Sequence, residues 1–228
     1  GWAAMSGLEL VTGPTIEPIS RIEAREHLRL DDDVDDSQIR AYILAARHWA
    51  ENATGRAFIT RTVRQSLDSS PGLSGAFWEG TRTGHQNMPQ SRSLELAVVP
   101  VISVSSIISY DDSDTATTLA TSNYYVDSAS DIAKVVLRDG GTFPTDLRAA
   151  NGIEITYTAG YGSSPSSVPE PLRLAIMQYM TFLYEHRGDF ERFPPPKPPA
   201  VLNSLLNPYK VLRFGAGPYG VVKRTGIS

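Results

Sequence analysis

The chain has 228 residues, of which 41% are hydrophobic and 20% are charged, a composition typical of a folded globular protein and too apolar for a disordered one. Its net charge of −4 gives no overall attraction to nucleic acid or to an anionic membrane. It contains no cysteine, which excludes disulfides, thiolate metal sites and cysteine nucleophiles. The longest uncharged run, residues 96–110, is too short to span a bilayer, which requires about 20 apolar residues.

Two helices are predicted in residues 19–56, after an N-terminal extension at 1–18. Ser20 and Glu23 have the spacing of a capping box, which indicates a helix that ends near Leu30. The acidic run at 31–36 then caps the second helix and complements its dipole. A calcium loop in this run is excluded, because Asp36 stands where such a loop needs glycine and Tyr42 where it needs glutamate.

The second helix, residues 35–56, has the strongest local pattern in the sequence. Its apolar positions recur at helical spacing and form one face: Ile39, Tyr42, Ile43, Ala46, Trp49, Ala50 and Ala53. Gly55 ends the helix. Leu44 breaks the pattern, because the helical wheel places it on the wet side among Arg40, His48 and Glu51. Leu44 is either an isolated surface leucine or a contact with another chain.

A β-sheet insertion is predicted at residues 57–160. Its segments are rich in β-branched and aromatic residues: 57–67, 94–99, 104–110, 124–127, 133–137 and 153–158. The last segment alternates apolar and polar residues, which predicts an antiparallel strand with one wet face. The 68–92 loop is unusually long and carries Phe77 and Trp78. It is interpreted either as a mobile excursion or as a docking loop, and both readings stay open.

A third helix is predicted at 168–188, with Pro169 and Pro171 in its first turn and Gly188 after its end. Its apolar face is widened by Met177, Met180 and Tyr184, which predicts that the helix is covered from two directions. The second cover is either the β insertion or a neighbouring subunit. The expected fold is therefore α+β: three main helices plus a short C-terminal one, an inserted antiparallel β-sheet domain and an extended C-terminal tail.

The C-terminal region is cationic on an otherwise acidic protein. A proline-rich linker at 189–199 precedes a short helix and tail at 200–228. From Arg192 to the end there are six basic residues and no acidic one. Aromatic and aliphatic residues are interleaved with these charges, so the segment either attaches to a partner or folds back on its own domain.

Motifs of catalysis and metal binding are absent from the sequence. The four histidines have no metal-ligand spacing, and there is no zinc-protease, nucleophile-elbow or phosphate-loop motif. Gly160-Tyr161-Gly162 predicts a turn rather than a dinucleotide site. The residues therefore favour a binding or structural module with no cofactor and no metal, rather than an enzyme. A hydrolase would require Asp31–Asp36 to converge with a histidine.

Six segments in order and spacing resemble phage head–tail connector proteins of the gp6-like and phiE125 gp8-like families, and also the same component of gene transfer agents. The resemblance extends from Ile19 to Phe214. It rests on HLRLDDDVDDSQIRAYILAARHWAENATGRAFITRT, ELAVVPVISVSSIISYDD, NYYVD, IEITYTAGYG, VPEPLRLAIMQYMTFLYEHRGDF and LLNPYKVLRF.

The resemblance implies a structural adaptor at the head–tail interface of a virion, assembled in the host cytoplasm. Such proteins form a ring, dodecameric in relatives, that binds beneath the portal and supports the stopper and tail, while double-stranded DNA passes through the lumen without sequence recognition. The implied portal-binding residues are Tyr209, Lys210, Arg213, Phe214, Tyr219, Lys223 and Arg224. We expect Leu44, His48, Met177, Met180 and Tyr184 at the subunit interface and no membrane contact. The alternative is another tail module, such as a stopper or baseplate protein.

Overall fold

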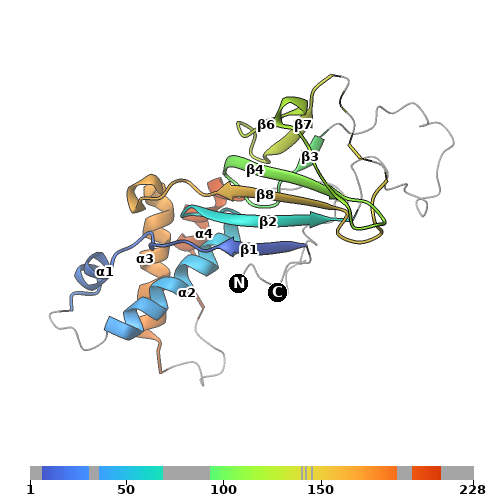
Figure 1. Ribbon diagram of the computed structural model, residues 1–228. Helices are drawn as coiled ribbons and strands as arrows, with labels where there is room; N and C mark the ends of the chain where they lie inside the picture. The colour runs from blue at the N-terminus through green and yellow to red at the C-terminus, as the bar shows by residue number, and fades with distance from the viewer. Residues whose placement is uncertain are drawn as a thin grey trace, which may run out of the picture.

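The structure is a computed structural model that describes residues 7–30, 36–68, 93–139, 141, 143–144, 146–188 and 197–211. It is elongated, with the helices at one end and the β-sheets at the other (Figure 1). The helices are α1 (Arg21–Leu28), α2 (Asp36–Thr54), α3 (Glu170–Glu185) and α4 (Val201–Leu206). The strands are β1 (Leu8–Thr12), β2 (Arg61–Leu67), β3 (Ser93–Glu95), β4 (Val101–Tyr110), β5 (Ala116–Thr118), β6 (Tyr124–Asp127), β7 (Lys134–Leu137) and β8 (Ile153–Ala159).

The helix ends follow the local signals of the sequence. Ser20 caps α1, and its capping box with Glu23 is complete in both directions. Gly55 follows α2 with a left-handed φ of 72°, and its N–H donates to the carbonyl of Glu51 at 2.8 Å. Pro169 is the N-cap of α3. The last turn of α3 ends at Glu185, slightly before the predicted end.

The strands form two antiparallel sheets. One has five strands in the order β1-β2-β8-β4-β5, and the other has three in the order β3-β7-β6. The central strand β8 pairs antiparallel on both sides, which confirms the predicted antiparallel strand. It alternates buried and half-buried residues, so its polar face is half-buried rather than wet. Two edge strands, β1 and β5, were not predicted. Four of the five residues of β1 and all three of β5 are exposed, so neither has the alternation that marks a strand.

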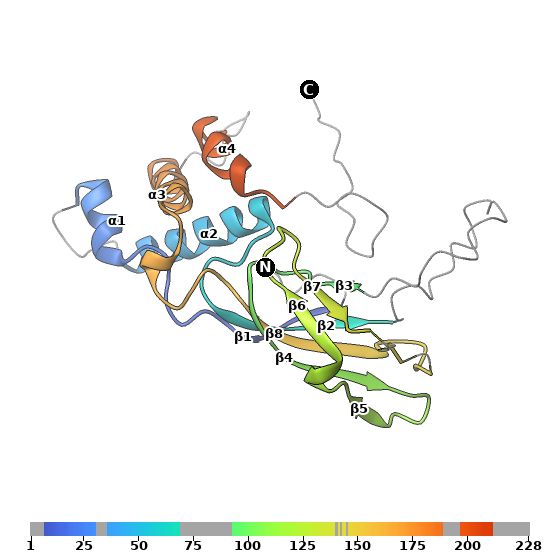
Figure 2. The same cartoon turned by 90° about the horizontal axis from the view of Figure 1, so that it is seen from above.

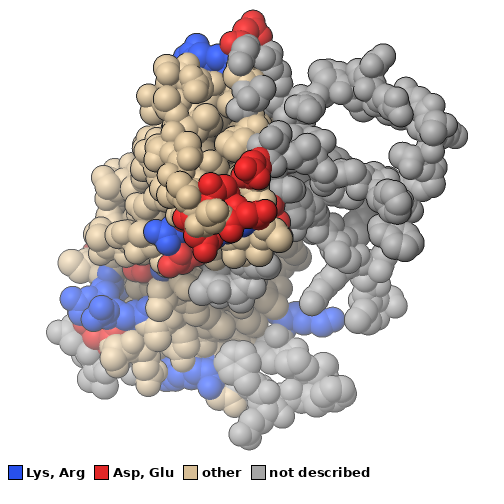
Figure 3. Space-filling model, turned by 45° about the vertical axis from the view of Figure 1, so that its right-hand side comes forward, with Lys and Arg blue, Asp and Glu red and all other residues tan. Residues whose placement is uncertain are grey.

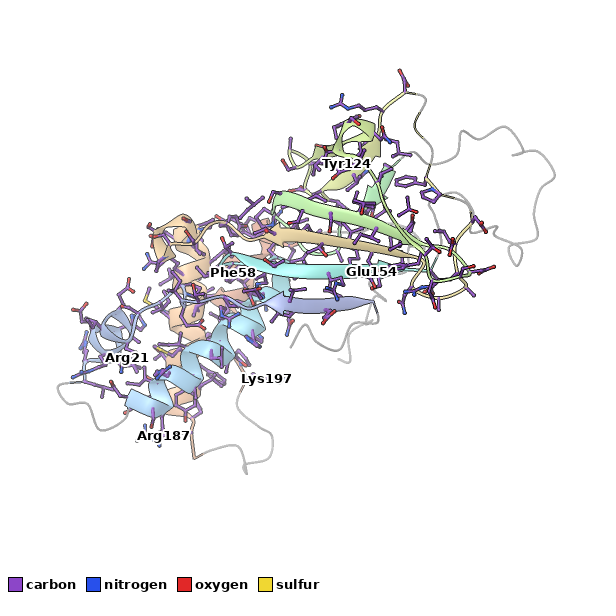
Figure 4. All side chains as sticks on the ribbon, in the orientation of Figure 1. Arg21, Phe58, Tyr124, Glu154, Arg187 and Lys197 are labelled. Carbon is purple, nitrogen blue, oxygen red and sulfur yellow. The ribbon has the colours of Figure 1, made fainter. Side chains whose placement is uncertain are left out.

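The interior has two hydrophobic clusters. The first lies in the β region, where Val63, Ile155 and Tyr157 pack with Leu94, Val135 and Leu137 of the smaller sheet. The second joins the helices and contains Ile39, Ile43, Leu172, Ile176 and Leu206. Phe58 and Ile59, which follow α2, belong to the helical cluster, and Phe58 lies where the helices meet the sheet (Figure 4). The segment between α2 and β2 therefore joins the two halves of the molecule.

The fold class is confirmed as α+β, with a helical bundle and antiparallel sheets whose strands β2 to β8 lie between α2 and α3. The first strand, β1, comes instead from the N-terminal segment before α1 and pairs with β2. Figure 2 shows α1 and α4 flanking the crossed pair of α2 and α3. Phe77 and Trp78 lie outside the described residues, as does nearly all of the 68–92 loop. Among the residues that the structure describes, no helix is long and apolar enough to cross a membrane.

Candidate assembly surfaces

A buried ionic cluster joins α2 to the sheet and to the N-terminal segment. Glu51 is fully buried, and its Oε1 accepts the N–H of Phe58 at 2.9 Å and pairs with Arg61. Its Oε2 accepts Arg47 Nη1 at 2.9 Å, and Arg47 Nε donates to Glu17 Oε2 at 2.6 Å. The placement of Glu51 on the wet side of the helix was wrong, because this cluster encloses its carboxylate.

A second set of contacts orients α1 against α3. Arg173 of α3 pairs with Glu23 of α1 and with Glu170 at 2.7 Å, and its Nε donates to the carbonyl of Pro18 at 3.1 Å. The capping contacts of Ser20 and the charge of Arg173 lower the pKa of Glu23, although its partial burial acts in the opposite direction. Neither this set nor the Glu51 cluster had been identified from the sequence. The sequence does contain one sign of the Glu51 cluster: Arg47 and Glu51 have the i, i+4 spacing at which side chains on a helix can form an ion pair.

The outer face of α2 carries two of the predicted interface residues. Leu44 is 44% exposed, which confirms its predicted surface position. His48 is half-buried one turn further along, and Arg40 is exposed one turn earlier. Burial and the positive charge of Arg47 lower the pKa of His48, which favours its neutral form at pH 7.

The other predicted interface residues lie on the inner and lateral sides of α3. Met180 is fully buried within the helical cluster of its own protomer. Met177 and Tyr184 are half-buried, and Tyr184 makes an edge contact with Tyr42 of α2, with ring centroids 6.3 Å apart. The widened apolar face of α3 is thus covered to a large extent by α2 within the chain.

The C-terminal segment is anchored at the end of α2. Arg56 Nε donates to the carbonyl of Tyr209 at 2.7 Å, while Arg56 Nη2 pairs with Asp131 at 3.0 Å. The N–H of Val211 donates to the carbonyl of Thr54 at 2.9 Å. Tyr209 and Lys210 are half-buried at this anchor. The remaining predicted portal-binding residues lie outside the described residues, namely Arg213, Phe214, Tyr219, Lys223 and Arg224.

The β end of the molecule is acidic. Its described residues in 8–12, 61–68 and 93–159 include eleven Asp and Glu but five Lys and Arg. Figure 3 shows acidic side chains gathered in one patch, and Figure 4 places Glu154 far from Arg21 and Arg187 at the helical end. Arg148, one of the few cations here, is paired with Asp114 at 2.9 Å. The two ends of the molecule thus differ in electrostatic character.

The described residues contain no group of three or more His, Cys, Asp or Glu side chains that could hold a metal ion. Of the acidic run that a hydrolase would use, residues 31–35 lie outside the described part of the chain. Asp36 contacts Arg21 of α1 at 2.8 Å, an ion pair that links the first two helices. This ion pair places the start of α2 beside the first turn of α1.

Comparison with known proteins finds a family match for part of the chain and structures of similar fold for nearly all of it. Residues 22–103 match the family described as phage gp6-like head-tail connector protein. Three similar solved structures come from gene transfer agent (GTA) particles, and each match covers 92% of this chain and 98% of the other. No curated protein sequence matches the chain.

The three structures are described as the virion of a native GTA particle, the neck of an empty particle computed with C6 symmetry and the neck of a native particle computed with C12 symmetry. Their sequence identities are 22%, 23% and 22%, and their TM-scores are 0.69, 0.70 and 0.68, in the same order. At such identities the likeness shows a common fold. The resemblance to head–tail connectors is therefore confirmed: residues 22–103 match the gp6-like connector family, and the whole described fold is that of chains from GTA particles.

Proposed function

We propose that this protein is a structural adaptor of the head–tail interface. Twelve copies form a ring beneath the portal of a phage or phage-like particle, join the capsid to the stopper and tail, and surround the exit path of double-stranded DNA. The protein transforms no substrate. The observation that carries the proposal is the match of residues 22–103 to connector proteins, together with a shared fold over 92% of the chain.

The shape and surface of the protein support this role. The elongated molecule has a rigid junction, because the Glu51 cluster fixes α2 to the sheet. One of the similar structures is a neck computed with C12 symmetry, which is compatible with a ring of twelve copies. A ring needs heterologous contacts between neighbours, and the exposed outer faces of the helices are available for such contacts.

The C-terminal segment is the proposed portal contact. Its first residues are held beside the end of α2, where Tyr209 accepts a hydrogen bond from Arg56 and Val211 donates one to Thr54, so residue 211 has a defined place on the body. Beyond that point the sequence has basic and apolar residues and no acidic one. We assign Tyr209, Lys210, Arg213, Phe214, Tyr219, Lys223 and Arg224 to the portal contact on this basis.

The test is assembly with the portal protein of the same particle. The full chain is mixed with portal rings, the mass of the complex is measured by light scattering, and the complex is imaged by electron microscopy. We expect a ring of twelve copies on each portal, whereas the free chain is either monomeric or a ring. A chain that neither forms rings nor adds to portals is not this adaptor. Binding to tail proteins with indifference to the portal would identify a stopper or baseplate module instead.

A further inference from the structure

The outer surface of α2 carries a narrow stripe of two exposed residues and one half-buried residue. Arg40, Leu44 and His48 are spaced four residues apart and lie on one side of the helix. Leu44 is 44% exposed at the centre of this α2 stripe, and its side chain is long enough to form an apolar contact. Arg40 supplies a positive charge one turn away, so the stripe is apolar at its centre and cationic at one end.

The outer surface of α3 carries a stripe of opposite charge. Glu170, Leu174 and Glu185 are exposed and lie within about 60° of one another around the helix. Leu174 is 39% exposed and lies one turn after Glu170 and about three turns before Glu185. Glu170 already pairs with Arg173 at 2.7 Å, while its side chain stays 76% exposed. Both charges of the stripe are therefore acidic and accessible.

The two stripes cannot meet within one protomer. The helices pack through Trp49 and Tyr179, whose rings stack with centroids 4.2 Å apart. Leu44 lies about 140° around α2 from Trp49, and Leu174 lies about 140° around α3 from Tyr179. Each stripe thus faces away from the helix contact that the protomer uses internally, and Leu44 and Leu174 stay exposed among the residues that the structure describes.

We propose that the α2 stripe of one copy packs on the α3 stripe of the next copy in the ring. This inference rests on the proposed ring function and names its subunit contact. Leu44 meets Leu174, and Arg40, one turn away, lies against Glu170 of the neighbouring copy. A contact between two different surfaces of the same chain is heterologous, the kind that closes into a ring.

Charge complementarity selects this pairing over the symmetrical ones. Two α2 stripes facing each other would set Arg40 against a second Arg40 if parallel or against His48 if antiparallel, with no acidic partner in either case. Two α3 stripes would bring the carboxylates of Glu170 and Glu185 toward further carboxylates. Like charges across a contact disfavour association, whereas opposite charges favour it and fix the register. A second copy of the chain therefore offers each stripe an exposed leucine and a charge of the opposite sign.

Thiol cross-linking tests the contact, because the chain has no native cysteine. Leu44→Cys and Leu174→Cys variants, one with a mass tag, are mixed with portal rings and treated with a short bismaleimide. We expect at least tenfold more mixed dimer than either variant gives alone. The Leu44→Cys/Leu174→Cys double variant gives a ladder of products that reaches the full ring. Ile102→Cys, on strand β4 and 52% exposed, is the matched control: mixed with Leu174→Cys it gives no mixed dimer above background, and the Ile102→Cys/Leu174→Cys double variant gives no ladder.

A charge swap supplies an independent readout. Arg40→Glu lowers the yield of mixed dimer several-fold, and Glu170→Arg in the partner restores it. Thermal unfolding of each variant monitors folding, since both positions are on the surface. Cross-linking of Leu44→Cys to itself, or a yield equal to that of the Ile102→Cys control, overturns the inference.

The outcome separates this inference from the proposed function. If the wild-type chain forms rings on portals but Leu44 and Leu174 do not cross-link within them, the adaptor role stands and the contact is made elsewhere. If the wild-type chain forms no ring and does not bind the portal, the proposed function itself is wrong. In that case, mixed dimers of the two cysteine variants are also absent.

Discussion

At the scale of single residues, the stability of the protein depends on the carboxylate of Glu51. It is fully buried and compensates two arginines that are themselves only 3% exposed, Arg47 and Arg61. Removing one partner from a buried ion pair leaves an uncompensated charge. We expect Glu51→Gln to lower the free energy of unfolding by about 3–5 kcal/mol.

Urea denaturation monitored by circular dichroism measures this loss. The matched control is Glu26→Gln, an exposed glutamate of α1, which should change the free energy of unfolding by less than about 0.5 kcal/mol. Equal effects of the two substitutions would show that the ionic cluster adds nothing to stability. Glu17→Gln should fall between them, because the Glu17 side chain is 32% exposed.

His48 gives the protein a pH dependence of known sign. Burial and nearby arginines lower its pKa in the folded state, so near pH 6 the unfolded chain binds more protons than the folded one. Its contribution to stability therefore falls as the pH drops through the ordinary histidine pKa of about 6.5. We expect His48→Gln to reduce the loss of stability between pH 7.5 and 5.5, as measured by thermal unfolding. The exposed His27→Gln is the control, and an equal effect there would contradict the assignment.

At the scale of elements, prediction from sequence succeeded where burial follows a period. The helix α2 was predicted because Ile39, Ile43, Ala46 and Ala50 repeat at helical spacing and are all buried. The strand β6 was predicted with the bounds that the structure has. The edge strand β1 was missed, since hydrogen bonding to β2 rather than side-chain burial holds it in the sheet. Local patterns report burial and not backbone pairing.

Some positions of the candidate site residues could be predicted from the helical wheel, and others depend on tertiary contacts. The exposure of Leu44 could be predicted, because it follows from the helical wheel alone. The burial of Glu51 could not, since it depends on Arg61 and Phe58, which reach α2 only through the turn after Gly55. Met180 likewise has a lateral position on an isolated α3, but in the folded chain it belongs to the helical cluster. Tertiary contacts decide such positions.

The close packing of strands β2, β8 and β4 depends on Gly160, which follows β8. Its φ is 136°, and an added Cβ would lie 2.7 Å from the backbone of Ile59 and Thr60. We expect Gly160→Ala to lower the free energy of unfolding by about 2–4 kcal/mol through strain and displaced backbone. Thermal unfolding measures it. Gly188→Ala is the control, because a Cβ added there would meet no atom within 4 Å, and it should be nearly neutral.

At the scale of the whole molecule, the distribution of charge suits a channel that DNA must slide through. The β end has a large excess of acidic residues, whereas every charged residue from Arg192 onward is basic. Tight phosphate contacts would hold DNA in place, and each such contact requires a lysine or arginine. In the proposed ring, an acidic body with a basic C-terminal segment separates DNA passage from portal binding.

This separation predicts weak DNA binding. Non-specific DNA-binding proteins have dissociation constants of about 10⁻⁴–10⁻⁶ M near physiological salt. At about 150 mM salt we expect the fluorescence anisotropy of a labelled duplex to stay unchanged up to about 100 μM of this protein. Any binding at low salt should disappear when residues 212–228 are removed, because this segment carries Arg213, Lys223 and Arg224 and no acidic residue. Tight binding that survives both the higher salt and the truncation would place a phosphate site on the body of the protein. Such a site would contradict a lumen through which DNA slides freely.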